Sequence, residues 1–349
     1  MDYILSRSLN SIIEKKNDYN ITILDPACGS GVFLVESFRR MVEKYIEKKR
    51  KISPEDLKRK LTDIVVKNIF GIDKSLDSIR VAAFSLYIAM LDYIEPRDIR
   101  KNGFEFPCLI YDENNKTSGK NFFKADFFDT TAIFNKEITF KGKNFDLILG
   151  NPPWGIPKGE NHPYEIYCNN QKPPIPISRR QIAEAFLVRA RDFAKEDTEI
   201  ALIVTSKILY NLNDKDFRKY FLSNFLITEV LEFSSVRTIM FNEAIGPGAI
   251  IFYKKGEGKK IENNEMSYYA LKPNLFSEKL RIIAAEGSEV KIIAQKYLID
   301  YDHLWKIMLN GNILDFYFFQ RMKKNYSTMA TFLKENSLLM GRGFEKGIV

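Results

Sequence analysis

Hydrophobic residues along the first 254 positions follow two alternating patterns. Short, β-branched apolar runs such as residues 21–24 predict strands, and stretches with apolar residues every three or four positions predict helices. The expected strands are 21–24, 68–73, 121–128, 145–149, 199–205, 225–233 and 249–254. The expected helices are 1–16, about 32–49, 51–67, 79–93, 181–194 and 214–223. Strands that alternate with helices predict a mostly parallel sheet covered on both faces.

The pattern weakens after about residue 255. A strand is expected at 268–271, a strand or short helix at 290–297, and a helix at 313–323. The predicted fold class is therefore α/β, a Rossmann-like, doubly wound, mostly parallel sheet with a C-terminal α/β extension. Residues 155–180, which contain five prolines, are expected to be a lid, a binding loop or a disordered segment without a clear element of its own.

The composition indicates the cellular compartment and the kind of partner that the chain suits. The 349 residues are 45% hydrophobic and 28% charged, which is typical of a globular protein. No apolar run is long enough to span a membrane, and residues 1–16 lack the pattern of a signal peptide. The three scattered cysteines fit a reducing cytoplasm, and the two histidines make a histidine-based metal site improbable. A net charge of +8 suits a polyanionic partner.

A glycine-containing turn, Asp25-Pro-Ala-Cys-Gly-Ser-Gly31, joins the first strand to a helix. Strand, tight turn and helix amino terminus together bring a ligand against backbone N–H groups. Gly29 and Gly31 permit positive φ and close approach of that ligand. The sequence therefore predicts a binding loop here, although a single G-x-G is a weak motif.

Two later strands also end in carboxylates. Asp73 closes the second strand and is placed to accept both hydroxyls of a ribose, with a helix N-cap as the competing interpretation. Asp126 follows the third strand and could accept from an adenine amine, with Phe127 covering the ring. A turn formed by Asp126 and Asp129 is the alternative.

The fourth strand runs into Asn151-Pro152-Pro153-Trp154. Two prolines fix φ and remove two backbone donors, so a carboxamide, free carbonyls and a flat ring stand on a rigid loop. Such a loop can hold a planar group that donates hydrogen bonds, for example a nucleobase amine. A Pro-rich turn with a Trp packed on top is the structural alternative. Ligands of doubly wound sheets bind at the carboxyl ends of strands, where Asp25, Asp73, Asp126 and Asn151 are all predicted.

In order and spacing over roughly residues 20–255, these segments resemble the S-adenosylmethionine-dependent DNA amino-methyltransferases of the adenine-N6 group. Asp25 to Gly31 is similar to the family's cofactor loop and Ile72-Asp73 to its ribose-binding acid. Asp126-Phe127 resembles its adenine-binding position, and Asn151 to Trp154 its catalytic tetrapeptide. Phe241, ahead of residues 248–252, resembles the aromatic that covers the other face of the target base. The order of the motifs is similar to the gamma arrangement.

The resemblance implies a class I methyltransferase that moves a methyl group from S-adenosylmethionine to N6 of a flipped-out adenine in double-stranded DNA, within a restriction-modification system. The implied catalytic residues are Asn151, Pro152, Pro153, Trp154 and Phe241. The implied cofactor-binding residues are Asp25, Ala27, Gly29, Gly31, Ile72, Asp73, Asp126 and Phe127, and no metal is required. A nuclease or specificity region or subunit is the further partner that the family implies.

The implied domains are a catalytic domain at 1–255 and a connector with the start of a target-recognition region at 256–349. The family's Thr-Pro segment before the first helix is not seen, so a fragment or a split subunit is expected. Methyltransferases of RNA bases or of protein glutamine carry a similar loop. A non-catalytic DNA-binding fragment is another alternative, and a Rossmann oxidoreductase would leave the Asn-Pro-Pro-Trp loop without a role.

Overall fold

The computed structural model describes residues 1–49, 51–97, 99, 104–112, 119–130, 140, 144–240, 246–280, 282 and 285–338. These residues fall into two compact units, Met1–Asp302 and His303–Val349. The first unit holds all nine strands of one sheet, in the order β3-β2-β1-β4-β5-β7-β6-β8-β9. The strands are β1 (Ile23–Asp25), β2 (Ile69–Asp73), β3 (Phe122–Lys124), β4 (Phe145–Gly150), β5 (Ala194–Thr205), β6 (Phe225–Glu232), β7 (Gly248–Lys255), β8 (Glu265–Ala270) and β9 (Val290–Ala294).

Parallel pairing dominates the half of the sheet that carries the predicted motifs. Strands β3, β2, β1, β4 and β5 are all parallel to their neighbours, whereas β7 lies antiparallel between β5 and β6. Strand β8 runs parallel to β6, and β9 closes the sheet antiparallel to β8. The predicted α/β fold with a mostly parallel sheet is therefore confirmed.

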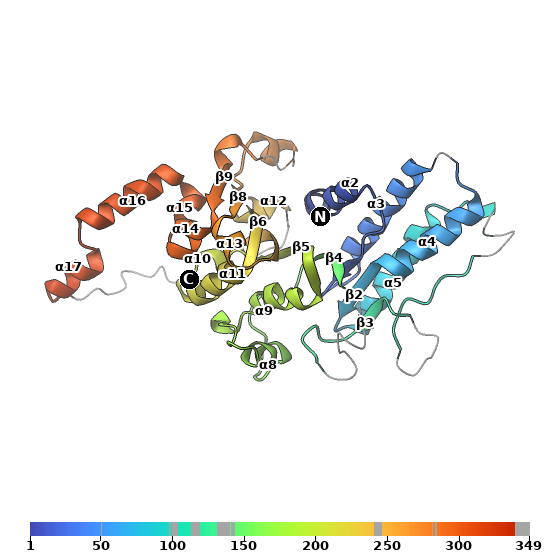
Figure 1. The fold of residues 1–349 in the computed structure, drawn as a ribbon, viewed down its shortest axis with the longest axis horizontal. Helices are drawn as coiled ribbons and strands as arrows, with labels where there is room; N and C mark the ends of the chain where they lie inside the picture. The colour runs from blue at the N-terminus through green and yellow to red at the C-terminus, as the bar shows by residue number, and fades with distance from the viewer. Residues whose placement is uncertain are drawn as a thin grey trace, which may run out of the picture. The chain divides into compact units, whose positions relative to one another are not determined.

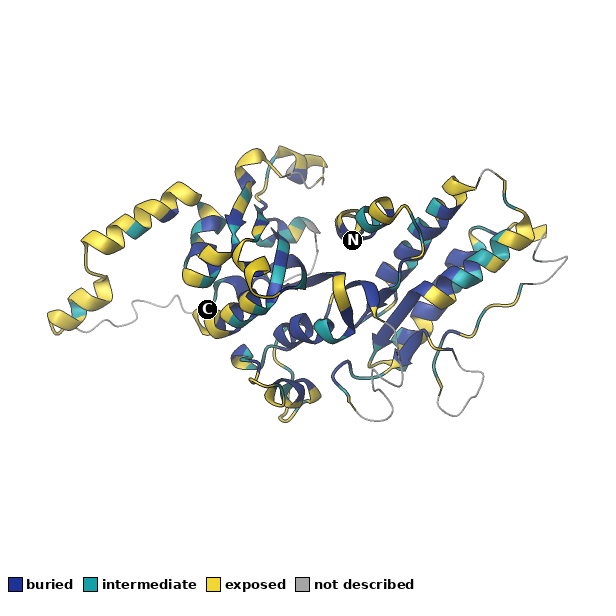
Figure 2. Ribbon diagram, in the orientation of Figure 1, coloured by how far each residue is buried: buried dark blue, intermediate teal, exposed yellow. Residues whose placement is uncertain are grey.

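One layer of helices covers the face of the sheet to which Ile23, Leu147, Ala201 and Phe252 contribute. Figure 1 shows α3, α4 and α5 side by side next to β2, and Figure 2 shows the strands as the most buried part of this unit. The helical segments of this layer are α1 (Asp2–Leu5), η1 (Ser6–Asn10), α2 (Ser11–Lys16), α3 (Val32–Lys48), α4 (Pro54–Asn68) and α5 (Leu76–Leu91).

An aromatic layer lies on the other face of the sheet, and Phe145 reaches it because β4 is irregular between Phe145 and Leu147. Phe70 of β2 and Phe145 of β4 have ring centroids 5.4 Å apart, and Phe140 links Phe145 to Phe193. The remaining helices of the unit are α8 (Pro163–Asn169), α9 (Ile182–Arg189), α10 (Lys207–Tyr210), α11 (Lys215–Asn224), α12 (Arg237–Met240), α13 (Lys259–Glu262) and α14 (Gln295–Asp300). Strands β1 and β4 are buried along their whole length, as expected for a sheet that is covered on both faces.

Three expectations about the elements change in detail. Strand β5 begins at Ala194, five residues before the predicted start, because Ala194 pairs with Phe145 at an irregularity in the ladder. Residues 155–180 are not without structure of their own, since α8 is capped by a reciprocal box between His162 and Glu165. Residues 290–300 form both of the predicted alternatives in succession, β9 and then α14.

The second unit contains α15 (Leu304–Asn310), α16 (Ile313–Asn325) and α17 (Met329–Glu335). Helix α16 begins at an Asn312 cap, whose side chain accepts from Leu314 N at 2.7 Å. Strands β8 and β9 lie within the first unit, so the compact unit extends beyond residue 255. A functional boundary at residue 255, between a catalytic domain and a connector, stays a prediction.

Candidate active site

The glycine loop after β1 is held in place by backbone hydrogen bonds to the neighbouring strand. Cys28 N donates to the Ile72 carbonyl at 2.9 Å, and Gly31 N donates to the Cys28 carbonyl at 2.8 Å. Gly31 has φ +77°, and a Cβ there would lie 2.8 Å from Ala82 Cβ of α5. Gly29 has φ +52°, and a Cβ there would meet no atom within 4 Å. The loop is thus closed on the helix side and open at Gly29, where a ligand can approach the backbone.

Asp25 is the buried end of β1 and lies directly against the end of β4. Its side chain is 1% exposed, and its Oδ1 accepts from Ala27 N at 3.0 Å. A Cβ on Gly150 would lie 2.6 Å from the same Oδ1, so only glycine leaves room for the carboxyl group. Burial, opposed by the hydrogen bond from Ala27 N and assisted by the nearby Asp73 charge, raises the pKa of Asp25 to about 7. Gly150 immediately precedes Asn151, so the two predicted loops are packed against each other.

Asp73 connects the glycine loop to the start of α5. Its Oδ2 accepts from Gly29 N at 3.0 Å, and its Oδ1 accepts from Ser75 N at 2.8 Å. The N-cap of α5 is Ser75, whose hydroxyl accepts from Ser78 N, so Asp73 is not the cap residue. Each carboxylate oxygen has two lone pairs, and Asp73 is only partly buried. The carboxylate can therefore accept further hydrogen bonds from a ligand. Ile72 beside it is fully buried in β2.

Asp126 is partly buried, and each of its carboxylate oxygens has a partner. Asp126 Oδ2 pairs with Lys74 Nζ at 2.8 Å, and Oδ1 accepts from Phe128 N at 2.9 Å. The turn interpretation has a structural basis as well, because Asp129 N donates to the Asp126 carbonyl at 2.9 Å.

Phe127 is turned away from solvent. Its side chain is 2% exposed and stacks on Phe186 and Phe193, with ring centroids 5.1 and 5.0 Å away. The predicted stacking of the Phe127 ring on a nucleobase has no support in this geometry and stays a prediction. The ring belongs to the aromatic layer, and this neighbourhood offers a ligand the backbone and the Asp126 carboxylate instead.

The Asn-Pro-Pro-Trp loop presents its carboxamide and fixes its indole. Asn151 is exposed, and its side chain makes no hydrogen bond with the described residues. Pro152 is buried and Pro153 is exposed. Trp154 Nε1 donates to the Ile203 carbonyl of β5 at 3.1 Å, which anchors the ring at the end of the sheet. The loop therefore combines a free amide with an immobilised aromatic ring.

Two glycines ahead of and within β7 shape the surroundings of that indole. A Cβ on Gly248 would lie 3.1 Å from Trp154 Cη2, and a Cβ on Gly246 would lie 3.7 Å from the six-membered ring. Phe241, the second predicted stacking residue, lies outside the described residues.

Strand order brings the predicted residues to one edge of the sheet. Strands β3, β2, β1 and β4 are adjacent and parallel, so Asp126, Asp73, Asp25 and Asn151 all follow carboxyl ends on the same side. Gly150, the Ile203 carbonyl and Gly248 also shape this edge and were not predicted. A glycine directly before Asn151 was the one visible signal, because a glycine at a strand end often marks close approach of another group.

Comparison with known proteins shows which families and proteins this chain is similar to. The model of the Eco57I restriction-modification methylase family matches residues 67–239. The type II restriction enzyme and methyltransferase RM.Eco57I of Escherichia coli is 26% identical over 254 residues, covering 65% of this chain and 24% of that protein. The type II methyltransferase M.BstVI of Geobacillus stearothermophilus is 22% identical over 262 residues, covering 75% of this chain and 42% of that protein.

Solved structures share the fold at low sequence identity. The ATP-dependent type ISP restriction-modification enzyme LlaBIII bound to DNA has a TM-score of 0.55 at 16% identity, covering 76% of this chain and 19% of that chain. The type I methyltransferase subunit of Streptococcus thermophilus has a TM-score of 0.51 at 15% identity, covering 81% and 53%.

The chain thus has the class I methyltransferase fold. The predicted resemblance of the chain to restriction-modification methylases is confirmed by the Eco57I family match and by the two curated relatives. The chain spans less than half the length of each of these curated relatives. Within the described ranges, no helix is long and apolar enough to cross a membrane, and no group of three His, Cys, Asp or Glu residues could hold a metal ion.

The raised pKa of Asp25 predicts a pH-dependent stability difference for Asp25→Asn. The folded protein holds a proton on Asp25 up to about pH 7, whereas an unfolded aspartate loses it near pH 4. Folding is therefore favoured by this group at low pH, and that contribution is lost as the pH rises to about 7. The amide keeps the acceptor for Ala27 N and removes the charge.

Asp25→Asn should consequently exceed the parent's free energy of unfolding by more near pH 8 than near pH 5, with a widening of at least about 1 kcal/mol. Urea unfolding at both pH values measures the difference, with the exposed Asp77→Asn as the control. Parallel pH curves for parent and Asp25→Asn would contradict the assigned pKa.

Proposed function

We propose that this chain transfers a methyl group from S-adenosylmethionine to the N6 amine of an adenine that has left the DNA double helix, as part of a restriction-modification system. The observation that carries the proposal is the exposed Asn151 carboxamide, which has no hydrogen-bond partner among the described residues. Asn151 lies next to the glycine loop because Gly150, the residue before it, packs against Asp25. The family match and the relatives support the choice of DNA as substrate.

The glycine loop and Asp73 fit a nucleoside cofactor. The space at Gly29 is open, and the Asp73 carboxylate lies next to it with free lone pairs for two ribose hydroxyls. Asp126 is the candidate acceptor for the adenine amine of the cofactor. When bound, S-adenosylmethionine would supply a methyl group on a positively charged sulfur, which leaves as a neutral thioether while N6 of the target adenine loses one proton to solvent.

Asn151 and Pro152 are the residues proposed to activate the adenine amine. An adenine amine is a weak nucleophile because its lone pair is conjugated with the ring. If Asn151 Oδ1 and the Pro152 carbonyl each accept one N6 hydrogen, they favour a more tetrahedral nitrogen whose lone pair can face the methyl group. The two acceptors stand on a loop that two prolines make rigid, so positioning and preorganised dipoles supply the rate enhancement.

Trp154 is proposed to hold the extruded base. Unstacking a base from the duplex costs a few kcal/mol, and stacking on an aromatic ring returns about 1–3 kcal/mol. The hydrogen bond from Trp154 Nε1 to the Ile203 carbonyl fixes the indole before the base arrives, so little side-chain entropy is lost on binding. Phe241 remains the proposed partner on the other face.

Asn151→Ala should abolish transfer without affecting cofactor binding. Loss of one preorganised acceptor is expected to lower kcat by about 100-fold or more. The dissociation constant for S-adenosylmethionine should stay within about twofold, because Asn151 contacts only the target amine. Tritium transfer to DNA and calorimetric titration measure the two quantities, and Asn169→Ala, an exposed amide in α8, is the control. A large loss of cofactor affinity in Asn151→Ala would refute the assignment.

Asp73→Ala should have the opposite profile. It removes the acceptor of Gly29 N and the proposed ribose acceptor, so cofactor affinity should fall by at least about tenfold. Asp77→Ala provides a matched control, since Asp77 is an exposed carboxylate only four residues away in the first turn of α5. Equal affinity of the Asp73 and Asp77 variants for S-adenosylmethionine in calorimetry would exclude Asp73 from the cofactor site.

Trp154→Ala should weaken capture of the extruded base, and Trp154→Phe should retain most of it. The phenyl ring keeps the stacking surface while losing the hydrogen bond to the Ile203 carbonyl. Fluorescence of 2-aminopurine at the target position rises when the base leaves the stack, so the rise should be smaller for Trp154→Ala than for the parent. Identical fluorescence in all three proteins would argue against stacking on Trp154.

The same measurements distinguish other substrates. Labelled cofactor incubated with DNA, with RNA or with protein extract identifies the acceptor directly. Transfer to RNA or to a protein glutamine in place of DNA would replace the proposed substrate and leave the roles of Asn151 and Asp73 unchanged. A chain that binds S-adenosylmethionine and DNA but transfers to none of the three would be a non-catalytic fragment.

A further inference from the structure

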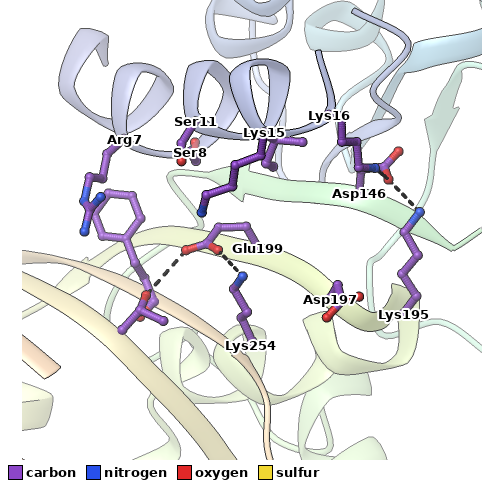
Figure 3. Close-up of a pocket in the computed structure, with 13 residues that line it drawn as sticks. Arg7, Ser8, Ser11, Lys15, Lys16, Asp146, Lys195, Asp197, Glu199 and Lys254 are labelled. Atoms are coloured by element: carbon purple, nitrogen blue, oxygen red, sulfur yellow. Dashed lines mark hydrogen bonds and ion pairs between the residues drawn. The ribbon is translucent and has the colours of Figure 1, made fainter. Parts of the chain in front are cut away.

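A cavity of about 350 Å³ lies at the edge of the sheet opposite the candidate active site. The starts of β4, β5 and β6 and the end of antiparallel β7 contribute Asp146, Lys195, Thr228 and Lys254 to its wall. The η1–α2 segment forms the other wall (Figure 3). Its size is within the range of small-molecule sites.

One buried carboxylate holds two lysines at this cavity. Lys16 Nζ and Lys195 Nζ both lie 2.6 Å from Asp146 Oδ1, and Asp146 Oδ2 accepts from Thr22 N and Thr22 Oγ1 at 2.9 and 2.7 Å. Burial opposes ionisation of Asp146, yet the hydrogen bonds from the two lysines and Thr22 outweigh it and hold its pKa well below the usual range. The two lysines together carry two positive charges, and Asp146 neutralises only one of them.

The other charges of the cavity leave a further ammonium group available. Lys254 pairs with Glu199 at 2.9 Å, and Arg7 pairs with the buried Glu229 at 2.6 Å. Lys15 extends from α2 into the cavity toward Glu199 (Figure 3) and makes no ion pair with any described residue. Asp197, exposed at the rim, is the one lining carboxylate that makes no ion pair with the described residues.

Lys16 and Lys195 can bind an anion without giving up their bonds to Asp146, and Lys15 lines the same cavity on the side of Glu199. Each ammonium group has three N–H donors, and Lys16 and Lys195 each use one on Asp146. Both lysine side chains are nearly half exposed, so the remaining donors can point to the cavity. Lysine is a common phosphate ligand because it acts as a compact point charge. The Ser11 hydroxyl lies in the same wall as a neutral donor.

We propose that this cavity is a binding site for a phosphate-bearing anion, coordinated by Lys15, Lys16 and Lys195 and opposed by Asp197. The site is separate from the proposed methyl transfer, because it lies at the amino ends of β4, β5 and β6 while Asp25, Asp73 and Asn151 lie at carboxyl ends. A free anion and a phosphate of a DNA backbone share this chemistry.

Calorimetric titration of the chain with inorganic pyrophosphate, at constant ionic strength set with sodium chloride, tests the site. Lys15→Gln and Lys195→Gln should each weaken pyrophosphate binding by about tenfold. Asp197→Asn should strengthen binding, which a purely structural role of these residues would not produce. Lys67→Gln, which removes an exposed lysine of α4, is the matched control and should bind like the parent.

No pyrophosphate binding above the chloride background would overturn the proposal, as would equal losses in Lys15→Gln and Lys67→Gln. Lys15 has no ion pair to lose among the described residues, so its variant keeps the test valid if Lys195→Gln unfolds.

A short DNA duplex, added in competition, identifies the source of the phosphate. Displacement of pyrophosphate by the duplex assigns the site to backbone phosphate, and no displacement assigns it to a free anion. Affinity for S-adenosylmethionine should be unchanged in Lys15→Gln, so this proposal and the proposed methyl transfer can fail separately.

Discussion

The close approach of Asp25 to Gly150 is the constraint on which the candidate active site depends. A Cβ at position 150 would lie 2.6 Å from Asp25 Oδ1, so the two strand ends fit together only because one of them lacks a side chain. Asp25 starts the glycine loop and Gly150 precedes Asn151. The proposed nucleoside pocket and the proposed acceptor for the amine are therefore held next to each other by this close approach and by the parallel pairing of β1 with β4. For a transfer between two bound molecules, small errors in this distance are costly.

The groups proposed to contact ligands are those that the fold leaves able to make further contacts. Asn151 has no hydrogen bond with the described residues, Asp73 retains lone pairs, and Gly29 faces open space. The residues that support these groups are hydrogen-bonded to the sheet. Trp154 Nε1 donates to the Ile203 carbonyl, and Cys28 N of the glycine loop donates to the Ile72 carbonyl. Rigid supports around unsatisfied polar groups are what a preorganised site requires.

Local sequence pattern sufficed for the strands, the glycine loop and the order of the motifs, because each depends on a few consecutive residues. It failed where packing between distant segments decides. Phe127 and Phe128 are adjacent aromatics and both are buried, which no local pattern distinguishes from a ring that faces a ligand. The contact between Asp25 and Gly150 joins residues on neighbouring strands, and the strand order that creates it appears only in the folded chain. The lysines at Asp146 were equally hidden, because Lys16 and Lys195 are far apart in the sequence.

Asp25 and Asp146 show how one sheet gives two aspartates opposite properties. Both side chains are largely buried at ends of adjacent strands, β1 and β4. Asp25 has a single backbone donor and another carboxylate nearby, so burial dominates and its pKa rises to about 7. Asp146 has two lysines and both donors of Thr22, so it stays ionised despite its burial. The donors available at each end thus explain two different groups. Asp25 has a pKa near 7 at one edge, and Asp146 keeps a negative charge that binds two lysines at the other. Burial opposes ionisation at both positions, and the number of donors that reach each carboxyl group decides whether that opposition prevails, as at Asp25, or is overcome, as at Asp146.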